Sequence, residues 1–441
     1  MERFEEFREI GLNEELIRAL EVKGFNEPTE IQAKTIPLVL EGKDILGGSA
    51  TGSGKTLAYL AGILQNTVKN GGVQSLILAP TRELAIQVAD AVREFSRYNP
   101  LRVCTVYGGV SINNQIIKLR TSEVVVGTPG RIIDHLERRT LDLKNVKTLV
   151  LDEADVMLDM GFVEAVEKII YAVPKPRQTL LFSATISNDI ERISSRHMDN
   201  PVKISGQRLV DPTKLSQVYY DVTKQLKFSL LVHLLKEEET GLAMVFCNTQ
   251  RNTDFVAKNL KANGIRALAI HGGLTQARRS ERMEMFHSKN FDVLVCTDVA
   301  ARGLDIKGVT CVVNYDIPND SKQYLHRVGR TARAGMAGKS YSLLSEIDHE
   351  NFSRVLHTNK VVIKRVETPL VERVKILAKD FSNNNFGRRK GGNSNRNSSR
   401  QKRSESSGSG GSGSSSHGPK TSGNYATRRR GARTNGRTRS R

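Results

Sequence analysis

The residues with the clearest chemistry lie between Ser49 and Thr56, in the stretch Ser-Ala-Thr-Gly-Ser-Gly-Lys-Thr. A short apolar run precedes this stretch and a helical pattern follows it, which is the context of a P-loop. In a P-loop, backbone N–H groups and the helix N-terminus surround phosphate groups. We therefore expect Lys55 to reach the β- and γ-phosphates of a nucleotide and the Thr56 hydroxyl to bind Mg²⁺. The first position of the pattern is Ser49 instead of glycine, and a Gly/Ser loop before a helix can also be a simple turn.

Two carboxylates, Asp152 and Glu153, directly follow the apolar run Thr148–Leu151. A carboxylate at the end of such a strand can hold Mg²⁺ near a P-loop, and its neighbour can orient or deprotonate the attacking water. An isolated pair of this kind is more often a solvated surface or a helix N-cap. Because a P-loop precedes on the same predicted sheet edge, the catalytic interpretation is favoured here.

Three arginines, Arg327, Arg330 and Arg333, lie close together in the second half of the chain. Phosphoryl transfer gains from a cation placed against the transition-state charge. The second half contains no P-loop of its own, so its arginines are suited to complete a site that forms when two domains close. Taken alone, the cluster could also be a solvated patch or a surface that faces a polyanion.

Short apolar runs alternate with helical patterns along most of the chain, starting after a first predicted helix at Glu14–Lys23 that Gly24 would end. This alternation predicts an α/β fold with parallel sheets and helices on both faces. Polar turns follow the runs, and the carboxyl ends of parallel strands share one edge, so we expect these turns to gather there. The runs are Ser75–Ala79, Val103–Tyr107, Val124–Gly127, Thr148–Leu151 and Thr179–Phe182, then Leu242–Cys247, Ala267–Ile270, Val293–Cys296, Cys311–Tyr315 and Ser340–Leu343.

The periodicity divides the chain into two domains and a tail. We predict a first domain at 1–206, a linker at 207–213, a second domain at 214–368, and a linker with a basic tail at 369–441. From Phe381 onward the sequence is Gly, Ser, Asn and Arg with almost no apolar residues, which predicts disorder.

Charge and composition narrow the class of protein. The net charge is +20, and the last 61 residues hold 15 Lys/Arg against one acidic residue, Glu405. Such asymmetry indicates a polyanion partner, most often nucleic acid. No apolar run is long enough for a membrane span, and the acidic N-terminus lacks a signal-peptide core, so we expect a cytoplasmic protein. Four scattered cysteines without metal-ligand spacing are expected to be reduced thiols of the core.

The motifs occur in an order that resembles the DEAD-box RNA helicases of helicase superfamily 2. The sequence Asp152-Glu153-Ala154-Asp155 spells the family's motif, and the matches extend over about residues 4–365. The resemblance implies two tandem RecA-like domains, ATP and Mg²⁺ as cofactors, and RNA as the partner. It also makes Ser49 less unusual, since the family's loop often starts with a small residue other than glycine.

The resemblance assigns the nucleotide site residue by residue. The stretch from Phe25 to Gln32 resembles the Q motif, in which Gln32 reads the adenine edge, and Phe7 matches an aromatic that stacks on adenine. Thr29 and Gln32 also have capping-box spacing, so Gln32 could simply cap a helix. Asp305 matches a residue that touches the ribose. The full nucleotide set is Phe7, Phe25, Thr29, Gln32, Ala50, Thr51, Gly52, Ser53, Gly54, Lys55, Thr56 and Asp305.

The resemblance also implies coupling and RNA-binding residues. Ser183 and Thr185 match a motif that links the ATP state to unwinding through Asp155, Arg330 and Arg333 match arginine fingers, and His326 matches a coupling residue. Contacts to the RNA backbone carry no base code. They are expected from Pro80, Thr81, Arg82, Gly109, Thr128, Pro129, Gly130 and Arg131 in the first domain and from Gly272, Arg279 and Thr297 in the second.

Three functions fit these motifs. The first is an ATP-dependent RNA helicase that separates short duplexes, with the Arg-rich tail as a non-specific RNA tether or, alternatively, a solubilising segment. The second is an ATP-gated RNA clamp or annealing factor with little unwinding. The third, a DNA-directed superfamily 2 helicase or another P-loop ATPase, is disfavoured by the Q-motif-like stretch and the Asp-Glu-Ala-Asp spelling.

Overall fold

The structure is a computed structural model that describes residues 4–48, 53–205, 214–237, 241–288, 290–302, 304, 306, 308–332, 336–359 and 363–377. The predicted linker at 207–213 and the chain from residue 378 onward lie outside these ranges. So do five predicted site residues, which are Ala50, Thr51, Gly52, Asp305 and Arg333.

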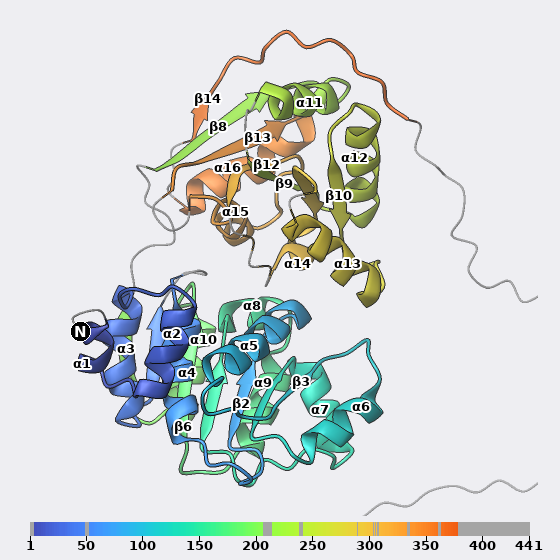
Figure 1. The fold of residues 1–441 in the computed structure, drawn as a ribbon. Coiled ribbons are helices and arrows are strands. Elements are labelled where there is room, and N and C mark those ends of the chain that lie inside the picture. The colour runs from blue at the N-terminus through green and yellow to red at the C-terminus, as the bar shows by residue number, and fades with distance from the viewer. Residues whose placement is uncertain are drawn as a thin grey trace, which may run out of the picture. The chain divides into compact units, whose positions relative to one another are not determined.

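The first half of the chain forms a parallel sheet with the strand order β3-β4-β2-β5-β6-β1-β7 (Figure 1). All neighbouring pairs are parallel, so the connections between consecutive strands are crossovers, which usually contain a helix. The strands are β1 (Ile45–Gly48), β2 (Ser75–Leu78), β3 (Val103–Val106), β4 (Val124–Gly127), β5 (Thr148–Leu151), β6 (Gln178–Ser183) and β7 (Val202–Ser205).

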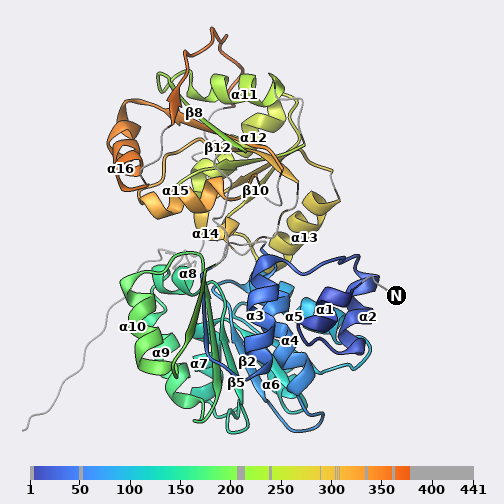
Figure 2. The same ribbon diagram turned by 90° about the vertical axis from the view of Figure 1, so that its left-hand side faces the viewer.

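Helices cover both faces of this sheet. Figure 2 shows α3 to α5 on one side of it and α8 to α10 on the other. The helices are α1 (Glu5–Glu9), α2 (Glu14–Val22), α3 (Glu30–Leu40), α4 (Lys55–Asn66), α5 (Arg82–Phe95), α6 (Ile112–Leu119), α7 (Pro129–Glu137), α8 (Ala154–Asp159), α9 (Val163–Ala172) and α10 (Asn188–His197).

Alternation along the strands explains how one sheet serves two cores. Successive side chains of a strand point to opposite faces, so a strand buried on both faces is apolar throughout. In β1, Ile45 packs with α1 to α5, whereas its neighbour Leu46 packs with the helices of the other face. In β6, Leu180 and Leu181 divide in the same way.

The second half repeats the architecture with the strand order β10-β11-β9-β12-β13-β8-β14, again with parallel pairing. Its strands are β8 (Leu215–Asp221), β9 (Leu242–Phe246), β10 (Ala267–Ile270), β11 (Val293–Cys296), β12 (Val309–Asn314), β13 (Gly338–Leu344) and β14 (Lys364–Arg365). Its helices are α11 (Lys227–Glu237), α12 (Gln250–Ala262), α13 (Gln276–His287), α14 (Asp298–Ala301), α15 (Ser321–Val328), a 3₁₀ turn at Glu346–Asp348, and α16 (His349–Asn359). The α/β class with two parallel sheets is therefore confirmed.

The second domain extends further than the predicted boundary at residue 368. Val371 and Val374 pack against the core under α11 and α12. The backbone N–H of Val374 donates to Ser229 Oγ at 3.2 Å, and that of Leu377 donates to Asn259 Oδ1 at 2.6 Å. The segment has neither helical nor strand periodicity, so its sequence does not show that it packs on this domain. Side chains of α11 and α12 hold its backbone instead.

The four cysteines are free and buried, as predicted. Burial raises the pKa of the Cys104 thiol to about 11, which keeps it protonated at neutral pH. Among the described residues, no helix has both the length and the apolar character that a membrane crossing requires.

Candidate nucleotide and RNA site

The turns at the carboxyl ends of the first sheet's strands form two groups, one predicted to contact RNA and one predicted to hydrolyse ATP. The turns predicted to contact RNA follow β3, β4 and β2, which are neighbours at one end of the strand order. The P-loop follows β1, Asp152 follows β5 and Ser183 ends β6, and these strands are also neighbours. The fold therefore places the RNA-binding candidates and the hydrolysis candidates side by side, with β2 and β5 at the boundary.

The Q-motif candidates are tied to the P-loop by hydrogen bonds. The Thr29 hydroxyl donates to the carbonyl of Ser53 at 2.9 Å, and Gln32 Nε2 donates to the carbonyl of Gly54 at 3.1 Å. Gly54 has a φ of +95°, and a Cβ there would collide with Gln32 Nε2. Only glycine fits this position, because both the backbone angle and the contact exclude a side chain.

Gln32 does cap its helix, as the alternative interpretation predicted. Its Oε1 accepts from the N–H of Thr29 at 2.9 Å, and the side chain is fully buried. Both ends of the amide are thus bound to backbone groups, so reading adenine stays a prediction. Phe7 is also fully buried, stacked on Phe4 within the core. Stacking on a base requires an exposed ring face, which Phe7 does not offer in this structure, whereas Phe25 is partly exposed.

Asp152 lies at the end of β5 in a nearly closed environment, 2% exposed. Tyr59 on α4 donates its hydroxyl hydrogen to Asp152 Oδ2 at 2.9 Å. Lys55 Nζ lies 3.8 Å from Asp152 Oδ1, and neither atom has a hydrogen-bond partner in the described structure. Burial raises the pKa of Asp152, and Lys55 opposes that shift. A carboxylate oxygen that accepts no hydrogen bond and lies beside a lysine fits the ligand set of a Mg²⁺–nucleotide site.

Glu153 occupies an unusual backbone conformation. Its φ and ψ are 50° and 51°, the left-handed region, and it stands as N-cap of α8. For a residue with a Cβ this costs on the order of 1–2 kcal/mol. The surrounding sheet and helix hold this conformation, which fixes the carboxylate at the β5 edge, 5% exposed.

The predicted contact between Asp155 and the Ser183-Ala184-Thr185 motif is present. Asp155 Oδ2 accepts from the backbone N–H of Thr185 at 2.8 Å and from its hydroxyl at 2.9 Å. The Ser183 hydroxyl accepts from the N–H of Asp155 at 3.3 Å and donates to the carbonyl of Thr185 at 2.7 Å. Because these groups join the ends of β5 and β6, the hydrolysis motif and the coupling motif form one buried network.

Arg82 lies against the glycine turn that follows β3. Thr81 caps α5 by accepting from the N–H of Leu84 at 3.3 Å, which sets the first turn of the helix where Arg82 begins it. A Cβ on Gly109 would collide with Arg82 Nη1, and Gly109 has a φ of +84°. The guanidinium can therefore lie across this turn only because position 109 is glycine.

The segment Thr128–Arg131 opens α7. Thr128 is the N-cap, Pro129 follows at the first helical position, and Gly130 is exposed, with open space where a Cβ would lie. Arg131 Nη1 donates to Gln115 Oε1 at 3.2 Å and to the carbonyl of Val110 at 3.4 Å. The first-domain RNA candidates thus lie on three adjacent turns, with Pro80 buried beneath them.

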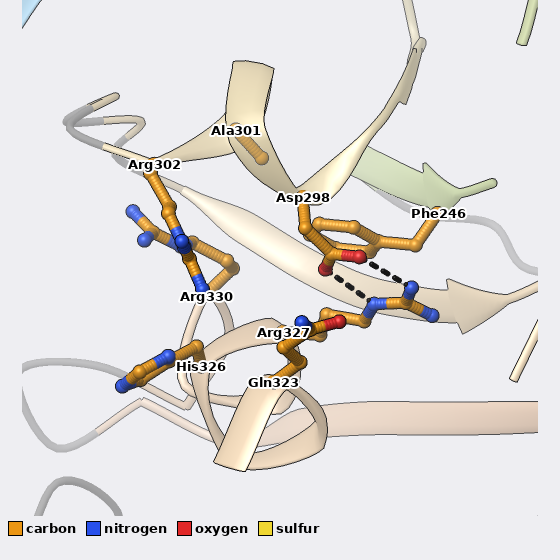
Figure 3. Close-up of a pocket in the computed structure, with 8 residues that line it drawn as sticks. All are labelled: Phe246, Asp298, Ala301, Arg302, Gln323, His326, Arg327 and Arg330. Atoms are coloured by element: carbon orange, nitrogen blue, oxygen red, sulfur yellow. Dashed lines mark hydrogen bonds and ion pairs between the residues drawn. The ribbon is translucent and has the colours of Figure 1, made fainter. Parts of the chain in front are cut away.

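Arg327 on α15 uses all of its donor groups in hydrogen bonds. It is 1% exposed and pairs with Asp298 through two hydrogen bonds of 2.6 and 2.7 Å, which Figure 3 shows as dashed lines. It also donates to Asn314 Oδ1 at 3.3 Å, to the carbonyl of Asp316 at 2.6 Å and to Asn248 Oδ1 at 2.9 Å. Arg327 therefore joins α15 to α14 and to the strand ends of β9 and β12.

Arg330 and His326 line the same pocket in the second domain (Figure 3). Arg330 is 7% exposed and donates to the carbonyl of Leu304 at 2.9 Å. Neither ring nitrogen of His326 has a partner among the described residues, and burial lowers the pKa of this imidazole. An imidazole that is neutral and unpaired is suited to receive a hydrogen bond from another group, which agrees with a coupling role as a prediction.

The second-domain RNA candidates occupy neighbouring strand ends. Gly272 follows β10 and is exposed, and Thr297 follows β11 as the N-cap of α14. Arg279 Nη2 donates to the carbonyl of Ala300 at 2.9 Å, and burial lowers the pKa of this guanidinium. Because β10 and β11 pair directly, the fold brings these three residues to one end of the sheet.

Sequence reasoning missed three residues that support the site. Tyr59 reads as an apolar helix residue, Gln115 as a surface residue of α6, and Asp298 as part of a longer motif. A polar group on a buried face of a helix was the available signal for Tyr59 and Gln115. Their partners lie far away in the sequence, so periodicity alone could not identify what they bind.

Comparison with known proteins agrees with this geometry. The family model for DEAD/DEAH box helicases matches residues 29–193, and the model for the helicase conserved C-terminal domain matches residues 226–335. The chain is 45% identical over 370 residues to the DEAD-box ATP-dependent RNA helicase CshA of Geobacillus kaustophilus, covering 83% of this chain and 79% of that protein. It is 46% identical over 367 residues to the ATP-dependent RNA helicase CshA of Listeria monocytogenes, covering 82% of this chain and 70% of that protein.

Solved structures show the same architecture. The S. cerevisiae protein Dbp5 bound to RNA and ADP BeF3 matches with a TM-score of 0.75 at 30% identity, covering 82% of this chain and 95% of Dbp5. A DEAD box protein from Methanococcus jannaschii matches with a TM-score of 0.52 at 40% identity, covering 82% of this chain and 98% of that one. The tandem parallel sheets, the motif geometry and these similarities together identify this chain as a member of the DEAD-box RNA helicase family.

Proposed function

We propose that this chain is an RNA-stimulated ATPase that separates short RNA duplexes locally. The observation that carries the proposal is a buried ion pair between Lys55 Nζ, at the start of α4, and Asp152 Oδ1, after β5, in which neither atom has a hydrogen-bond partner among the described residues. Buried polar atoms without partners are costly, and they persist where a ligand completes them. A nucleotide bound with Mg²⁺ supplies the phosphate oxygens and coordinated water that would satisfy both atoms.

The residues around this pair divide the work of hydrolysis. Lys55 would hold the β- and γ-phosphates, while Thr56 and Asp152 would hold Mg²⁺ largely through water. When bound, the metal ion neutralises part of the phosphate charge. Glu153, fixed by its left-handed backbone at the same edge, would orient the attacking water and accept its proton. Arg330 would place a cation against the transition-state charge, together with Arg333.

RNA would lie along the turns that follow β3, β4 and β2 in the first domain and β10 and β11 in the second. These turns present arginines, helix N-termini and hydroxyl groups, which suit phosphates and 2′-OH groups and carry no base code. Binding would therefore be independent of sequence. We also propose a cytoplasmic location for this activity.

The network of Asp155, Ser183 and Thr185 supports coupling between the two ligands. It connects the segment that holds Asp152 and Glu153 to the turn after β6. A shift of either strand end would break hydrogen bonds that are buried, so the two motifs should move as one. ATP and RNA would close the two domains, bend the bound strand and release its partner, and hydrolysis would reopen them.

We propose that the Arg-rich tail tethers RNA through non-specific phosphate contacts. Deleting residues 378–441 should lower RNA affinity and flatten its dependence on salt, because each lost phosphate contact reduces the slope of log K against log salt. The maximal ATPase rate should stay the same. An unchanged salt slope would contradict the tether and favour a solubilising tail.

A strand-displacement assay tests the helicase proposal. The substrate is a short RNA duplex with a labelled strand, and the controls are ADP in place of ATP and the variant Lys55→Ala. ATP-dependent release of the labelled strand is the expected result. ATP-dependent RNA binding or annealing without release would favour the alternative function, an ATP-gated clamp.

A comparison of RNA with single-stranded DNA as activator of ATP hydrolysis tests the nucleic-acid class. We expect RNA to stimulate hydrolysis much more strongly than DNA of the same sequence. Equal stimulation by both would favour a DNA-directed or general superfamily 2 enzyme.

A further inference from the structure

A buried polar network lies beneath the RNA-binding candidates of the first domain. His135 on α7 is fully buried, and Gln115 on α6 is 5% exposed. His135 Nε2 lies 3.0 Å from Gln115 Oε1, and His135 Nδ1 lies 2.8 Å from the Thr140 hydroxyl. Gln115 Nε2 donates to the carbonyl of Tyr107 at 3.0 Å. The amide thus links α7 to the end of β3.

The hydrogen bonds of this network define the tautomer of the imidazole. Gln115 Oε1 can only accept, so His135 Nε2 carries the hydrogen that it donates to this oxygen. Nδ1 is then unprotonated and can accept the single hydroxyl hydrogen of Thr140 at 2.8 Å, for which the carbonyl of His135, at 3.2 Å, is the longer alternative acceptor. Burial lowers the pKa of His135, with Arg131 acting in the same direction, so the neutral ring is favoured. One neutral, oriented imidazole therefore fixes the position of the Gln115 carbonyl.

The same carbonyl oxygen receives Arg131. Arg131 Nη1 donates to Gln115 Oε1 at 3.2 Å, while Val110 accepts at 3.4 Å and Asp134 lies 3.6 Å away. The Arg131 side chain is 15% exposed, so only one part of its guanidinium faces solvent. Gln115 is in turn held by hydrogen bonds to His135 Nε2 and to the carbonyl of Tyr107. Arginine side chains lose considerable rotamer freedom when they bind a phosphate, and a side chain fixed beforehand loses less.

We propose that Gln115 is a positioning residue for RNA binding, which acts by holding the guanidinium of Arg131 toward the RNA backbone and is itself held by His135 and Thr140. This inference rests on the proposed RNA contact of Arg131. It predicts that Gln115 affects RNA affinity through Arg131, without contacting RNA itself.

The test is a double-mutant cycle on the full chain. Gln115→Met keeps the length of the side chain and removes both the acceptor and the donor. Affinity for fluorescently labelled oligouridylate is measured in the presence of a non-hydrolysable ATP analogue, for the wild type, Gln115→Met, Arg131→Ala and the double variant. We expect Gln115→Met to weaken RNA binding about fivefold, the effect of one hydrogen bond. In the Arg131→Ala background the same change should have little further effect.

Two readouts separate positioning from a general structural effect. Affinity for a fluorescent nucleotide should stay near wild type in Gln115→Met. The thermal unfolding midpoint should fall by only about 2–8 °C, because the buried His135 Nε2–H and the Tyr107 carbonyl lose their partner while the fold is kept. Thr121→Ala, an exposed change just beyond α6, should leave RNA affinity unchanged. If Gln115→Met fails to fold, Gln115→Glu replaces it: this variant keeps an acceptor for Arg131 and should bind RNA more tightly than Gln115→Ala.

The outcomes distinguish the inference from the proposed function. If Arg131→Ala weakens RNA binding and Gln115→Met does not, the positioning role is wrong and the RNA contact stands. If both single changes weaken binding and their effects add fully, Gln115 acts independently of Arg131 and the inference is also wrong. If Arg131→Ala leaves affinity unchanged, the proposed RNA contact of Arg131 fails and the inference fails with it.

Discussion

Two buried charge sites at strand ends make an instructive comparison. In the first domain, Asp152 and Lys55 are buried, yet Asp152 Oδ1 and Lys55 Nζ have no hydrogen-bond partner in the described structure. In the second domain, Arg327 is buried to a similar degree and makes five hydrogen bonds, two of them to Asp298. Both sites look like candidates for phosphate chemistry in the sequence.

The difference is in hydrogen-bond satisfaction. A buried charge whose donors are all used stabilises the fold around it and has nothing left for a ligand. A buried charge with unused atoms lowers the stability of the free protein and gains when a ligand binds. By this criterion Lys55 and Asp152 are suited to bind a ligand, whereas Arg327 stabilises the fold. Arg327 does so although Arg330, in the same motif, is a proposed catalytic residue.

The largest expected effect is the loss of ATP hydrolysis when Arg330, in the same motif as Arg327, is replaced. Arg330→Ala should reduce the RNA-stimulated ATPase rate by roughly 10³ or more, because an arginine finger contributes about that factor. Its unfolding midpoint should stay close to that of the wild type. Steady-state hydrolysis is the measurement, and Arg354→Ala, an exposed change on α16, is the control. A loss of less than tenfold would remove Arg330 from the catalytic set.

The next effect concerns stability. Arg327→Met leaves the partly buried carboxylate of Asp298 without its cation and removes the donors to Asn248, Asn314 and the carbonyl of Asp316, so the free energy of unfolding of the second domain should fall by about 3 kcal/mol. Urea unfolding measures this change. The double variant Arg327→Met with Asp298→Leu should recover part of the loss, since it removes both charges. If Arg327→Met lowers hydrolysis while stability is unchanged, Arg327 belongs with the catalytic residues and the comparison is wrong.

A smaller effect is expected at Tyr59. Tyr59→Phe removes the hydrogen bond from Tyr59 to Asp152 Oδ2 and keeps the packing of the ring. The carboxylate of Asp152 is then held in place less firmly, and the lost hydrogen bond corresponds to about 1 kcal/mol of binding free energy. The Mg²⁺ concentration that supports half-maximal binding of a fluorescent ADP should rise about fivefold. Tyr171→Phe, at an exposed position on α9, serves as the control. An unchanged Mg²⁺ requirement would mean that Asp152 needs no such support.

The smallest effect is the dependence of stability on pH through His135. Burial lowers the pKa of His135 from its ordinary value of 6.5, so the unfolded chain takes up a proton there more readily than the folded chain. The contribution of this residue to stability is complete above pH 6.5 and is lost as the pH falls below it. His135→Gln should therefore lose less stability than the wild type between neutral pH and about pH 5.5. Equal losses would show that the ring is not held neutral.

Much of the fold could be predicted because the signals are local. Runs such as Val124–Gly127 and Val293–Cys296 are strands with the predicted bounds, since strands buried on both faces are apolar throughout. The edge strands β7 and β14 and the strand β8 were missed, because they carry polar residues and lack that continuous pattern. The edge strands β3 and β10 were found because they are apolar, so the polar composition of β7, β8 and β14 explains the misses.

The site could be predicted in part for the same reason. Lys55, Asp152 and Asp155 belong to motifs with fixed spacing. The contact of Asp155 with Thr185 is observed, whereas the phosphate contact of Lys55 and the Mg²⁺ contact of Asp152 stay predictions. The burial of Phe7, the bound amide of Gln32 and the structural role of Arg327 depend on residues far away in the sequence. Gln115 and Tyr59 were missed because their partners are brought close only by the sheet order β3-β4-β2-β5.

The most direct test of the central claim is steady-state ATP hydrolysis with and without single-stranded RNA, for the wild type and Glu153→Gln. The substitution keeps the size of the side chain and removes its capacity to accept a proton. We predict strong stimulation by RNA in the wild type and its loss in Glu153→Gln, with RNA and nucleotide still bound. RNA-independent hydrolysis by the wild type, or full activity of Glu153→Gln, would contradict the coupling of RNA to the carboxylates at the end of β5.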